Sequence, residues 1–409
     1  MHILFLTDNF PPEVNAPASR TFEHCREWVR LGEQVTVITC APNFPRGEVF
    51  AGYRNKLWQE EHVDGIRVIR VWTYITANEG FSKRILDYIS FMVSAVFAAL
   101  FVRKVDVIIG TSPQFFTACA AYAASVLKRR PWIFELRDIW PESIRAVGAM
   151  NESRLLDLLE KVELFLYRKA TAIISVTNSF KKTLIARGVD GNKISVVTNG
   201  VDSSRFAPRP KDEQLVTKLG LNGKFVAGYI GTHGMAHALD TLLDAAKLLA
   251  AKGDGDRFKI LLLGDGARKE ALKDRASTED ISNVVFIDTV PKDEVVRYWS
   301  VLDASIIHLR KTDLFTSVIP SKLFECMGMA IPVLHGVEGE SADIVEQTGV
   351  GLRFEPENAE ALCESMRKLA DDKELFQQFK QQGPTAAREY DRVVLAERMR
   401  EIIYGVVRT

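Results

Sequence analysis

The sequence predicts an α/β protein with two doubly wound domains, each built around a parallel sheet. Short apolar segments alternate with amphipathic helical patterns along the whole chain, which is the pattern of parallel strands covered by helices. The chain has 409 residues, of which 47% are hydrophobic, so it can bury two separate cores. A turn at Asn199-Gly200, followed by Pro208 and Pro210, indicates the boundary between the domains.

The first domain is predicted to cover residues 1–205. Its strands are expected at residues 2–7, 35–39, 66–71, 105–110, 132–136, 172–176 and 194–197. The loop after the first strand carries several small residues and Asn15, so its backbone can come close to a ligand. A plain connecting loop fits the same residues equally well. A helix is expected to follow at residues 19–31.

The second domain is predicted to cover residues 206–384. Its strands are expected at residues 225–230, 259–263, 284–287, 304–309, 332–335 and 351–354. The residues after 384 show one long helical pattern. We therefore expect the chain to end in a helix that is separate from the second sheet.

One helix of the second domain, residues 322–328, is suited to hold an anion. Ser321 is placed to cap its start. Free N–H groups and the helix dipole favour phosphate at a helix start, and Lys322 adds a positive charge in the first turn. One turn further, Glu325 can accept hydrogen bonds from the two vicinal hydroxyls of a ribose. Surface charges on an ordinary amphipathic helix are the alternative interpretation.

Charge and cysteine content indicate the environment of the protein. The net charge is zero, but residues 1–205 hold 26 Lys and Arg against 21 Asp and Glu, so the first domain is the one suited to an anionic surface. The five cysteines are far apart in the sequence, and the chain opens on a strand pattern rather than on a signal peptide. We expect a cytoplasmic protein with reduced cysteines and no nucleic-acid partner.

Residues 89–102 form an apolar run without a charge, bracketed by Lys83-Arg84 and Arg103-Lys104. The run is too short to cross a bilayer, which takes about 20 residues. It can be a buried crossover helix. It can equally be a helix that lies in the membrane interface with its basic flanks on lipid phosphates.

The segments described above resemble glycosyltransferase family 4. The resemblance rests on residues 303–309, Asp-Ala-Ser-Ile-Ile-His-Leu, on the helix that carries Glu325, and on residues 328–334, Gly-Met-Ala-Ile-Pro-Val-Leu. It implies the GT-B architecture, in which two Rossmann-like domains face each other across a cleft and a C-terminal helix, here residues 385–409, crosses back to the first domain. It also implies sugar transfer from a nucleotide sugar with retention of configuration and without a metal.

The resemblance implies where the donor binds. Two glycine loops, residues 231–234 and 264–266, would hold the diphosphate through N–H groups, and the backbone around Asp288 would meet the base. The donor-binding residues predicted in this way are Gly231, Thr232, His233, Gly234, Gly264, Gly266, Asp288, Ser317, Val318, Ile319, Ser321 and Glu325.

Three positions depart from the family pattern. Ser317 stands where the family has the first of two glutamates, and Thr232 and His237 stand where much of the family has Arg and Lys. We expect Arg310 and Lys322 to replace the missing charges and to carry catalysis by stabilising the leaving diphosphate.

Two motifs resemble one bacterial subgroup of the family. Residues 137–142, Arg-Asp-Ile-Trp-Pro-Glu, and residues 319–322, Ile-Pro-Ser-Lys, are similar to those of surface-polysaccharide transferases, including transferases of N-acetyl-L-fucosamine from a UDP donor. Backbone N–H groups of residues 317–319 would hold such a 6-deoxy sugar.

The acceptor side is expected to include Asn15, Arg137, Asp138 and Glu142, although ion pairing among the charged residues is an alternative. The resemblance implies a lipid-linked glycan acceptor, carried on polyprenyl diphosphate. We therefore expect an enzyme that is peripheral to the cytoplasmic face of the inner membrane.

Other interpretations stay open. His233 and His237 have the spacing of a zinc pair, and Asp254-Gly-Asp256 resembles a metal-binding Asp-x-Asp, but both lie in predicted loops, so no metal is expected. A transferase with a soluble acceptor is a second possible function. A non-catalytic nucleotide-binding protein is a third, because Ser317, Thr232 and His237 lack the family's charges.

Overall fold

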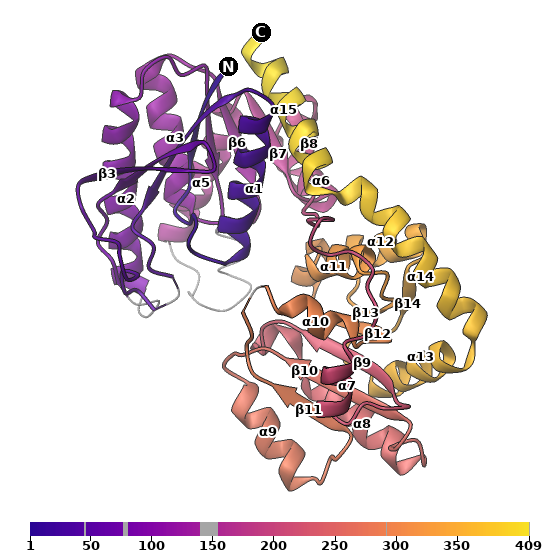
Figure 1. Cartoon of the computed structure of the whole chain (residues 1–409). Helices are drawn as coiled ribbons and strands as arrows, with labels where there is room; N and C mark the ends of the chain where they lie inside the picture. The colour runs from indigo at the N-terminus through magenta and orange to yellow at the C-terminus, as the bar shows by residue number, and fades with distance from the viewer. Residues whose placement is uncertain (45, 77–80, 140–153, 292, 409) are drawn as a thin grey trace. The chain divides into compact units, whose positions relative to one another are not determined.

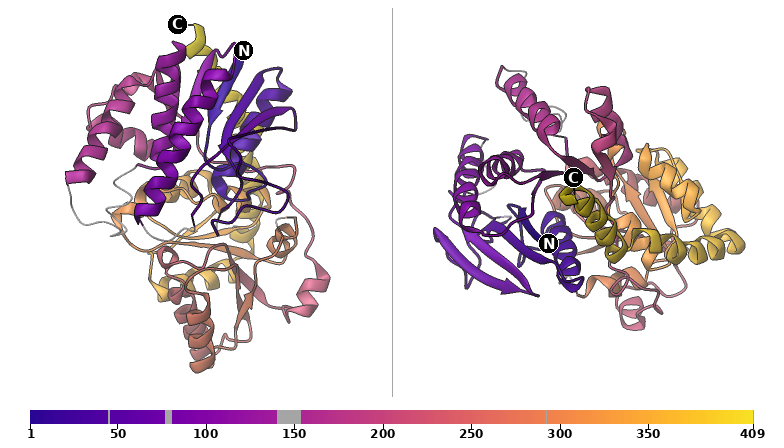
Figure 2. Two further views of the ribbon diagram at one scale, coloured as in Figure 1. Left: turned by 90° about the vertical axis from the view of Figure 1, so that its left-hand side faces the viewer. Right: turned by 90° about the horizontal axis from the view of Figure 1, so that it is seen from above.

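The structure is a computed structural model that describes residues 1–44, 46–76, 81–139, 154–291 and 293–408. The chain forms two compact units, Met1–Thr198 with Arg392–Thr409, and Asn199–Asp391. Figure 1 and Figure 2 show the helices and strands of each unit in three views. Each unit contains one open sheet with helices on both faces, which confirms the predicted fold class of two doubly wound α/β domains.

The first unit is built on an eight-stranded sheet of order β3-β4-β2-β1-β5-β6-β7-β8. All pairs are parallel except β3 with β4. The order reverses between β1 and β5, and ligands of such sheets bind beyond the carboxyl ends of the strands at this point. The strands are β1 (His2–Leu6), β2 (Gln34–Cys40), β3 (Trp58–Val63), β4 (Ile66–Val71), β5 (Val107–Thr111), β6 (Trp132–Leu136), β7 (Ala172–Ser175) and β8 (Ile194–Val196).

Strand β3 is absent from the sequence prediction. Its residues, Trp-Gln-Glu-Glu-His-Val, contain three titratable side chains, and all six are exposed or half-buried. It is an edge strand, and β4 is its one partner among the described strands. Such a strand contributes little to the core, so its sequence contains no apolar run from which the strand can be predicted.

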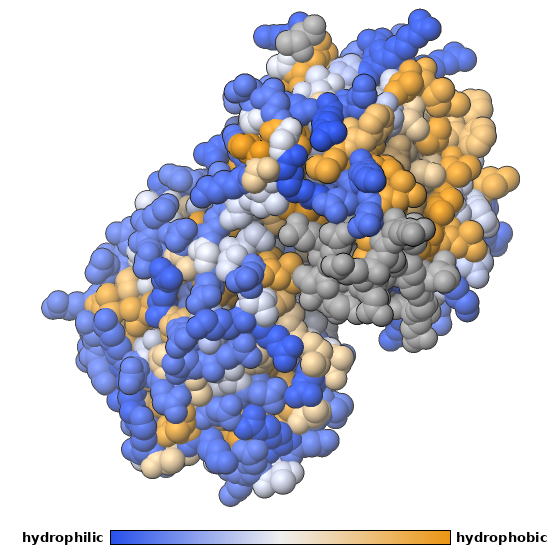
Figure 3. Space-filling model, turned by 180° about the vertical axis from the view of Figure 1, so that it is seen from behind, coloured by the Kyte–Doolittle hydropathy of each residue, from blue (hydrophilic) through white to orange (hydrophobic). Residues whose placement is uncertain are grey.

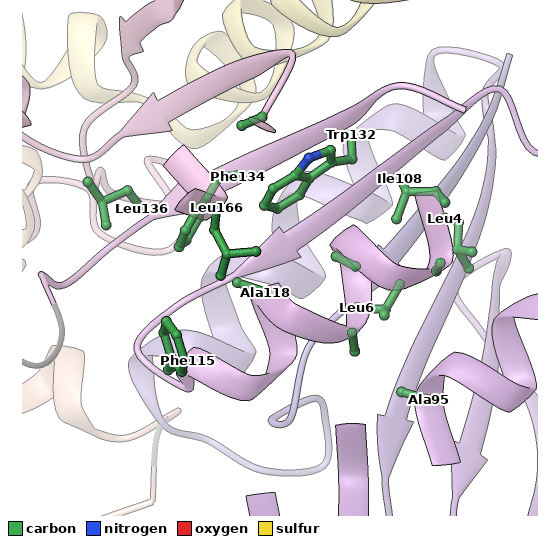
Figure 4. Close-up of a cluster of buried hydrophobic side chains, with 14 of the residues drawn as sticks. Leu4, Leu6, Ala95, Ile108, Phe115, Ala118, Trp132, Phe134, Leu136 and Leu166 are labelled. Carbon is green, nitrogen blue, oxygen red and sulfur yellow. The ribbon is translucent and has the colours of Figure 1, made fainter. Parts of the chain in front are cut away.

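Two hydrophobic clusters cover the faces of the first sheet. On one face Trp132 and Phe134 of β6 pack with Ala118 of α3 and Leu166 of α5 (Figure 4). The other face carries α1 and α15. The helices of this unit are α1 (Ala16–Arg30), α2 (Phe81–Phe101), α3 (Phe115–Lys128), α5 (Arg154–Lys169), α6 (Asn178–Ala186), the short η1 (Gly191–Lys193) and α15 (Arg392–Arg408).

The second unit is built on a six-stranded parallel sheet of order β11-β10-β9-β12-β13-β14, which reverses between β9 and β12. Its strands are β9 (Phe225–Ile230), β10 (Phe258–Leu263), β11 (Val284–Ile287), β12 (Ala304–His308), β13 (Val333–Gly336) and β14 (Gly351–Arg353). Its helices are α7 (Glu213–Lys218), η2 (Met235–His237), α8 (Asp240–Ala251), α9 (Lys269–Thr278), α10 (Val295–Ser300), η3 (Asp313–Ser317), α11 (Lys322–Gly328), α12 (Glu340–Thr348), α13 (Ala359–Asp371), α14 (Lys373–Ala387) and η4 (Arg388–Tyr390).

The chain enters and leaves the second unit at neighbouring points. Val201 forms a parallel bridge with Asp391, and its N–H donates to the Tyr390 carbonyl oxygen at 2.9 Å. The boundaries between the units fall after residues 198 and 391. The sequence analysis places them after residues 205 and 384. The prediction of one long helix from residue 385 is wrong, because Asp391 takes an extended conformation to pair with Val201 and this interrupts the helical pattern.

The C-terminal helix α15 belongs to the first unit, as expected for a chain that crosses back. Trp28 of α1 donates its indole N–H to the Ala396 carbonyl oxygen at 2.8 Å. Glu33 accepts from Arg400 at 2.7 Å and from Tyr404 at 2.8 Å. The helix therefore completes the core on this face of the sheet rather than lying loosely on it.

Truncation of Met399, which is fully buried against α1, should destabilise the first unit. Met399→Ala is expected to cost about 2–4 kcal/mol, because it removes a buried side chain and leaves a cavity. Urea unfolding followed by tryptophan fluorescence and circular dichroism measures this loss. Val393→Ala, at an exposed position of the same helix, is the matched control and should change stability by less than about 0.5 kcal/mol. Equal losses in both variants would show that α15 does not contribute to this core.

Candidate functional site

Two glycine loops meet at the carboxyl ends of β9 and β10. The Gly231 N–H donates to Leu263 at 2.9 Å, and the His233 N–H donates to Asp265 at 2.8 Å. Gly264 has a φ of 145°, and a Cβ atom there would lie 1.8 Å from the Gly231 carbonyl oxygen. Only glycine permits this contact, so the sequence of the loops fixes how closely they approach.

Lys322 of α11 lies against the first of these loops. A Cβ atom on Gly231 would lie 2.5 Å from its Nζ, which sits 3.7 Å from the centre of the Tyr229 ring. The Tyr229 hydroxyl in turn donates to the Thr232 carbonyl oxygen at 2.9 Å. Burial lowers the pKa of Lys322 to about 8. An amine that is poorly solvated in this way gains from binding an anion.

The start of α11 differs from the prediction. Ser321 is already helical in conformation, with φ −58° and ψ −29°, and its side chain makes no cap hydrogen bond. The Leu323 N–H donates to Pro320 and the Phe324 N–H donates to Ser321. The predicted cap is therefore wrong, because the turn begins before Ser321. The amine of Lys322, which lies against the first glycine loop, offers the positive charge at this helix start.

Two histidines, one in the first loop and one just after it, add no charge to the site. His233 is fully buried, and neither of its ring nitrogens makes a hydrogen bond with any described residue. Burial and then the nearby amines of Lys269 and Lys322 lower the pKa of His233 to about 4. Burial similarly lowers the pKa of His237 to about 4, and its Nδ1 is also without a partner. Neutral imidazoles thus occupy the site at neutral pH.

Lys269 is a functional candidate that the sequence analysis missed. It lies at the start of α9, is 4% exposed, and donates to the Gly264 carbonyl oxygen at 2.8 Å and to Asp288 at 2.6 Å. The Asp288 side chain, at the end of β11, is therefore paired with Lys269. The sequence analysis had predicted only that the backbone at Asp288 meets the base of the nucleotide. A lysine three residues after a Gly-x-Gly turn was the signal available in the sequence.

Arg310 lies at the end of β12, close to the first glycine loop in the fold. Its N–H donates to the Ala236 carbonyl oxygen at 2.9 Å, which fixes the backbone beside η2. The guanidinium is exposed and makes no hydrogen bond or ion pair with the described part of the chain. The neighbouring Lys311 is instead paired with Glu355 at 2.6 Å. Arg310 is therefore the cation of this pair that is free to meet a ligand.

Residues 317–319 are only partly available for the predicted role. The Ser317 hydroxyl donates to Leu314 at 3.1 Å, and the Val318 N–H donates to Phe315 at 3.2 Å. The Val318 N–H is thus used inside the chain in this conformation, because η3 ends there, and its contact with a sugar stays a prediction. Ile319 is buried. Glu325 lies three residues beyond Lys322 in α11 and acts on it electrostatically.

In the first unit Arg137 and Asp138 follow β6. The Ser112 hydroxyl oxygen accepts from both of their N–H groups, at 2.8 and 3.2 Å. Burial lowers the pKa of Arg137 to about 10, and its Nε makes no hydrogen bond with any described residue. This guanidinium is a second candidate for contact with an anion.

The other two predicted acceptor-side residues have different outcomes. Asn15 caps α1, since its Oδ1 accepts from the Ala18 N–H at 2.9 Å and its Nδ2 donates to Asn9 at 2.6 Å. Its side chain is therefore committed to the helix start, which begins at Ala16 rather than at residue 19. Glu142 lies outside the described residues.

Helix α2 has two apolar faces. Phe91, Ala95 and Ala99 are fully buried in the core, whereas Phe97 and Phe101 are 62% and 72% exposed. Figure 3 shows hydrophobic side chains gathered on the surface of the first unit. Residues Lys83–Phe101 are long and apolar enough to cross a membrane, although a core helix passes the same test. A buried crossover helix and a helix in the membrane interface are therefore compatible interpretations of this segment. One face of α2 packs in the core, and the other is exposed.

The chain matches two family models. Residues 15–200 match the glycosyl transferase 4-like domain, and residues 211–386 match glycosyl transferases group 1. It is 23% identical over 380 residues to the Escherichia coli protein named colanic acid biosynthesis glycosyl transferase WcaI, covering 90% of this chain and 92% of the relative. It is 24% identical over 355 residues to a GDP-mannose-dependent alpha-mannosyltransferase of Mycobacterium tuberculosis, covering 86% and 83%.

Solved structures share the fold across the whole chain. Sucrose-phosphate synthase from Thermosynechococcus elongatus has a TM-score of 0.74 at 14% identity, covering 99% of this chain and 98% of that one. Anabaena HepE, solved in complex with UDP-glucose, has a TM-score of 0.72 at 17% identity, covering 99% and 100%. At these identities the similarity shows the fold alone.

Binding of UDP at pH 8 should take up protons if Lys322 faces the bound diphosphate. With a pKa of about 8 the amine is roughly half protonated, and a bound anion raises its pKa, so about half a proton is gained. Calorimetry in buffers of different ionisation enthalpy measures this uptake. Lys322→Arg, which stays charged, is the matched control and should take up none. Identical uptake in both proteins would place Lys322 away from the anion.

Proposed function

Because this chain is a glycosyltransferase of the GT-B architecture, with a glycosyl transferase 4-like domain and a glycosyl transferases group 1 domain, we propose that it moves a sugar from a UDP-sugar to a lipid-linked glycan. The observation that carries the proposal is the placement of Lys322 against Gly231, with Glu325 three residues further along the same helix. A cation for a diphosphate and a carboxylate for ribose hydroxyls thus occur together.

The chemistry assigned to this site is stabilisation of a leaving diphosphate. The bond between the anomeric carbon and the diphosphate breaks, and its electron pair stays on the nucleotide as the acceptor hydroxyl bonds to that carbon. Lys322 and Arg310 are proposed as the catalytic residues that stabilise this growing charge. The proton of the acceptor passes to the leaving diphosphate on the same face, which corresponds to retention of configuration without a metal.

The donor sugar is proposed to be an N-acetylated 6-deoxyhexose, such as N-acetyl-L-fucosamine. Ser317 supplies no carboxylate for sugar hydroxyls, which favours a sugar with fewer of them. The uridine base is supported by the complexes of HepE with UDP and UDP-glucose. The relative named for GDP-mannose makes a guanosine donor the main competitor.

The acceptor is proposed to be a polyprenyl diphosphate glycan of a bacterial surface polysaccharide, such as O-antigen or capsule. Relatives named for colanic acid, capsular polysaccharide and amylovoran biosynthesis support this class of product. The exposed face of α2, with Lys83, Arg84, Arg103 and Lys104 at its ends, supports a location at the cytoplasmic face of the inner membrane.

Two other functions remain candidates. A soluble acceptor would leave the exposed face of α2 without a role. A non-catalytic nucleotide-binding protein is favoured by the neutral state of His233 and His237, where much of the resembled family has cations. Nucleotide release from a panel of UDP- and GDP-sugars separates the two transferases from the third candidate, because a non-catalytic protein releases no nucleotide from any donor.

Glu325→Ala should weaken UDP binding by about 1–3 kcal/mol, because it removes charge-assisted hydrogen bonds to the ribose. Calorimetry with UDP measures the change. Glu364→Ala, at an exposed position of α13 in the same unit, is the control and should bind like the wild type. An unchanged affinity in Glu325→Ala would refute the assignment of Glu325 to the ribose.

Binding to anionic vesicles should decrease with salt but not vanish. Each basic residue near the surface adds only about 1 kcal/mol, which salt screens, whereas inserted apolar side chains are not screened. The double variant Phe97→Asp with Phe101→Asp should remove the salt-resistant part in a flotation assay. Val393→Asp, on the opposite face of the sheet, should leave it intact. A wild type that ignores vesicles at low salt would favour the soluble acceptor.

A further inference from the structure

His308 is a buried histidine at the end of β12 that has no part in the chemistry proposed above. It is 1% exposed, and its ring stacks on the ring of Phe354, with centroids 5.8 Å apart and an angle of 3° between the planes. A Cβ atom on Gly336 would lie 2.7 Å from His308 Cδ2 and 2.4 Å from Phe354 Cζ. Only glycine at position 336 leaves room for the stacked pair, so the packing gives the His308 ring little freedom.

Both ring nitrogens of His308 are hydrogen-bonded to backbone groups. Nε2 lies 2.9 Å from the N–H of Glu357, which can only donate, so Nε2 is the acceptor of this bond. In a neutral imidazole the other nitrogen then carries the proton, and Nδ1 donates it to the His237 carbonyl oxygen at 2.8 Å. Burial lowers the pKa of His308, so the ring stays neutral and keeps both bonds at neutral pH.

The two hydrogen bonds connect turns whose backbone is strained. Ala238, directly after His237, has a φ of 43°, and Glu357 has a φ of 60°. Both residues lie in the left-handed region, which is unfavourable for a residue with a Cβ atom. His308 therefore joins the turn that follows the first glycine loop to the turn that follows β14.

Helix η2 is held to the sheet through its backbone. All three of its residues are half-buried or exposed, and Met235 is 57% exposed. The Arg310 N–H donates to the Ala236 carbonyl oxygen at 2.9 Å. The end of β12 thus binds two consecutive carbonyl groups of η2, one through a backbone N–H and one through the His308 side chain.

The position of η2 matters because this helix carries His237 beside the proposed donor site. The His237 ring lies 5.8 Å from the Tyr229 ring, and the amine of Lys322 lies 3.7 Å from the centre of that same ring. The charge of Lys322 acts on His237, so the two groups are close enough to interact. A shift of the His237 backbone would therefore change the surroundings of the amine that is proposed to meet the diphosphate.

We propose that His308 is a positioning residue, whose hydrogen bond from Nδ1 to the His237 carbonyl oxygen holds η2 in the conformation that binds a nucleoside diphosphate. The proposal rests on the proposed function only where it names a nucleoside diphosphate as the ligand. His308 acts through η2 and does not touch the ligand, because its ring packs between Phe354 and Gly336 and both of its nitrogens are bonded to the chain.

Two substitutions at position 308 separate the two hydrogen bonds. The amide of Asn is attached at Cγ, as Nδ1 is in histidine, so His308→Asn keeps a donor for the His237 carbonyl oxygen. The amide of Gln lies one bond further out, near the place of Nε2, so His308→Gln keeps an acceptor for the Glu357 N–H. Both variants lose the stacked ring, so each is the matched control of the other.

Calorimetry with UDP and with GDP measures the effect on the donor site. His308→Asn should bind within about threefold of the wild type, whereas His308→Gln should bind at least about tenfold more weakly. An equal or larger loss in His308→Asn would overturn the proposal, because the lost ring would then explain the effect. Unchanged affinity in His308→Gln would overturn it as well.

Hydrogen exchange tests the hold on η2 without a ligand. The amides of residues 235–241 should exchange faster in His308→Gln than in the wild type, and His308→Asn should stay close to the wild type. Residues 355–361 should behave in the opposite way, because His308→Asn loses the bond to Glu357. Equal exchange of residues 235–241 in the two variants would overturn the role of Nδ1.

If both variants fail to fold, nitrogen-15 NMR of the wild type labelled at histidine takes their place. The proposal requires that His308 carries its proton on Nδ1, and a proton on Nε2 would overturn it. Phe354→Leu assigns the His308 signals, since it removes the stacked ring and its effect on their chemical shifts while both hydrogen bonds remain.

The outcomes also separate this proposal from the proposed function. If the wild type binds neither UDP nor GDP, the proposed donor fails, and the exchange of residues 235–241 still decides whether His308 holds η2. If the protein turns over a donor but His308→Gln binds the nucleotide normally, the transferase function stands and the positioning role fails.

Discussion

The contact between Gly264 and the Gly231 carbonyl oxygen is the constraint on which the second domain's site depends. Any side chain at Gly264 would collide with that oxygen, so only glycine allows the two loops to close over the ends of β9 and β10. That closure places Gly231 under the amine of Lys322, and it holds the Gly264 carbonyl against Lys269. The amines of Lys322, the first residue of α11, and of Lys269 thus lie against the backbone of these two loops.

The two domains carry opposite kinds of buried, incompletely neutralised charge. In the first domain burial raises the pKa of Asp8, whereas in the second burial lowers the pKa of Lys322. Perturbed pKa values of this kind cluster at functional sites. The amine of Lys322 suits a diphosphate.

Helix α2 shows how one segment can serve two environments. Its buried face consists of small and aromatic residues that pack on the first sheet, and its exposed face repeats large apolar residues at helical spacing. A soluble protein has no energetic reason to expose such a stripe, so a covering surface is expected. The basic residues at both ends of α2 are suited to lipid phosphates, which makes an anionic membrane the proposed cover.

The sequence by itself determined the position of those strands and helices that show a local apolar pattern. The bounds of β6, β9, β11 and α11 are as predicted, because buried parallel strands read as continuous apolar runs without reference to their neighbours. Gly231 and Lys322 were proposed as site residues from local features, a glycine loop and a helix start, whereas Gly264 was proposed from the resemblance of its loop to one of the family. The division into two units followed from the length and from the repeated alternation of strand and helix.

The tertiary structure decided whatever depends on a partner distant in the sequence. The break at Asp391 follows from its bridge to Val201, and the role of Lys269 follows from its contact with Gly264. The tautomer of His308 follows from its bonds to Glu357 and His237, which lie 49 and 71 positions away in the sequence. Whether a charged group is neutralised depends on the groups that the fold packs around it, and a linear pattern does not contain that information.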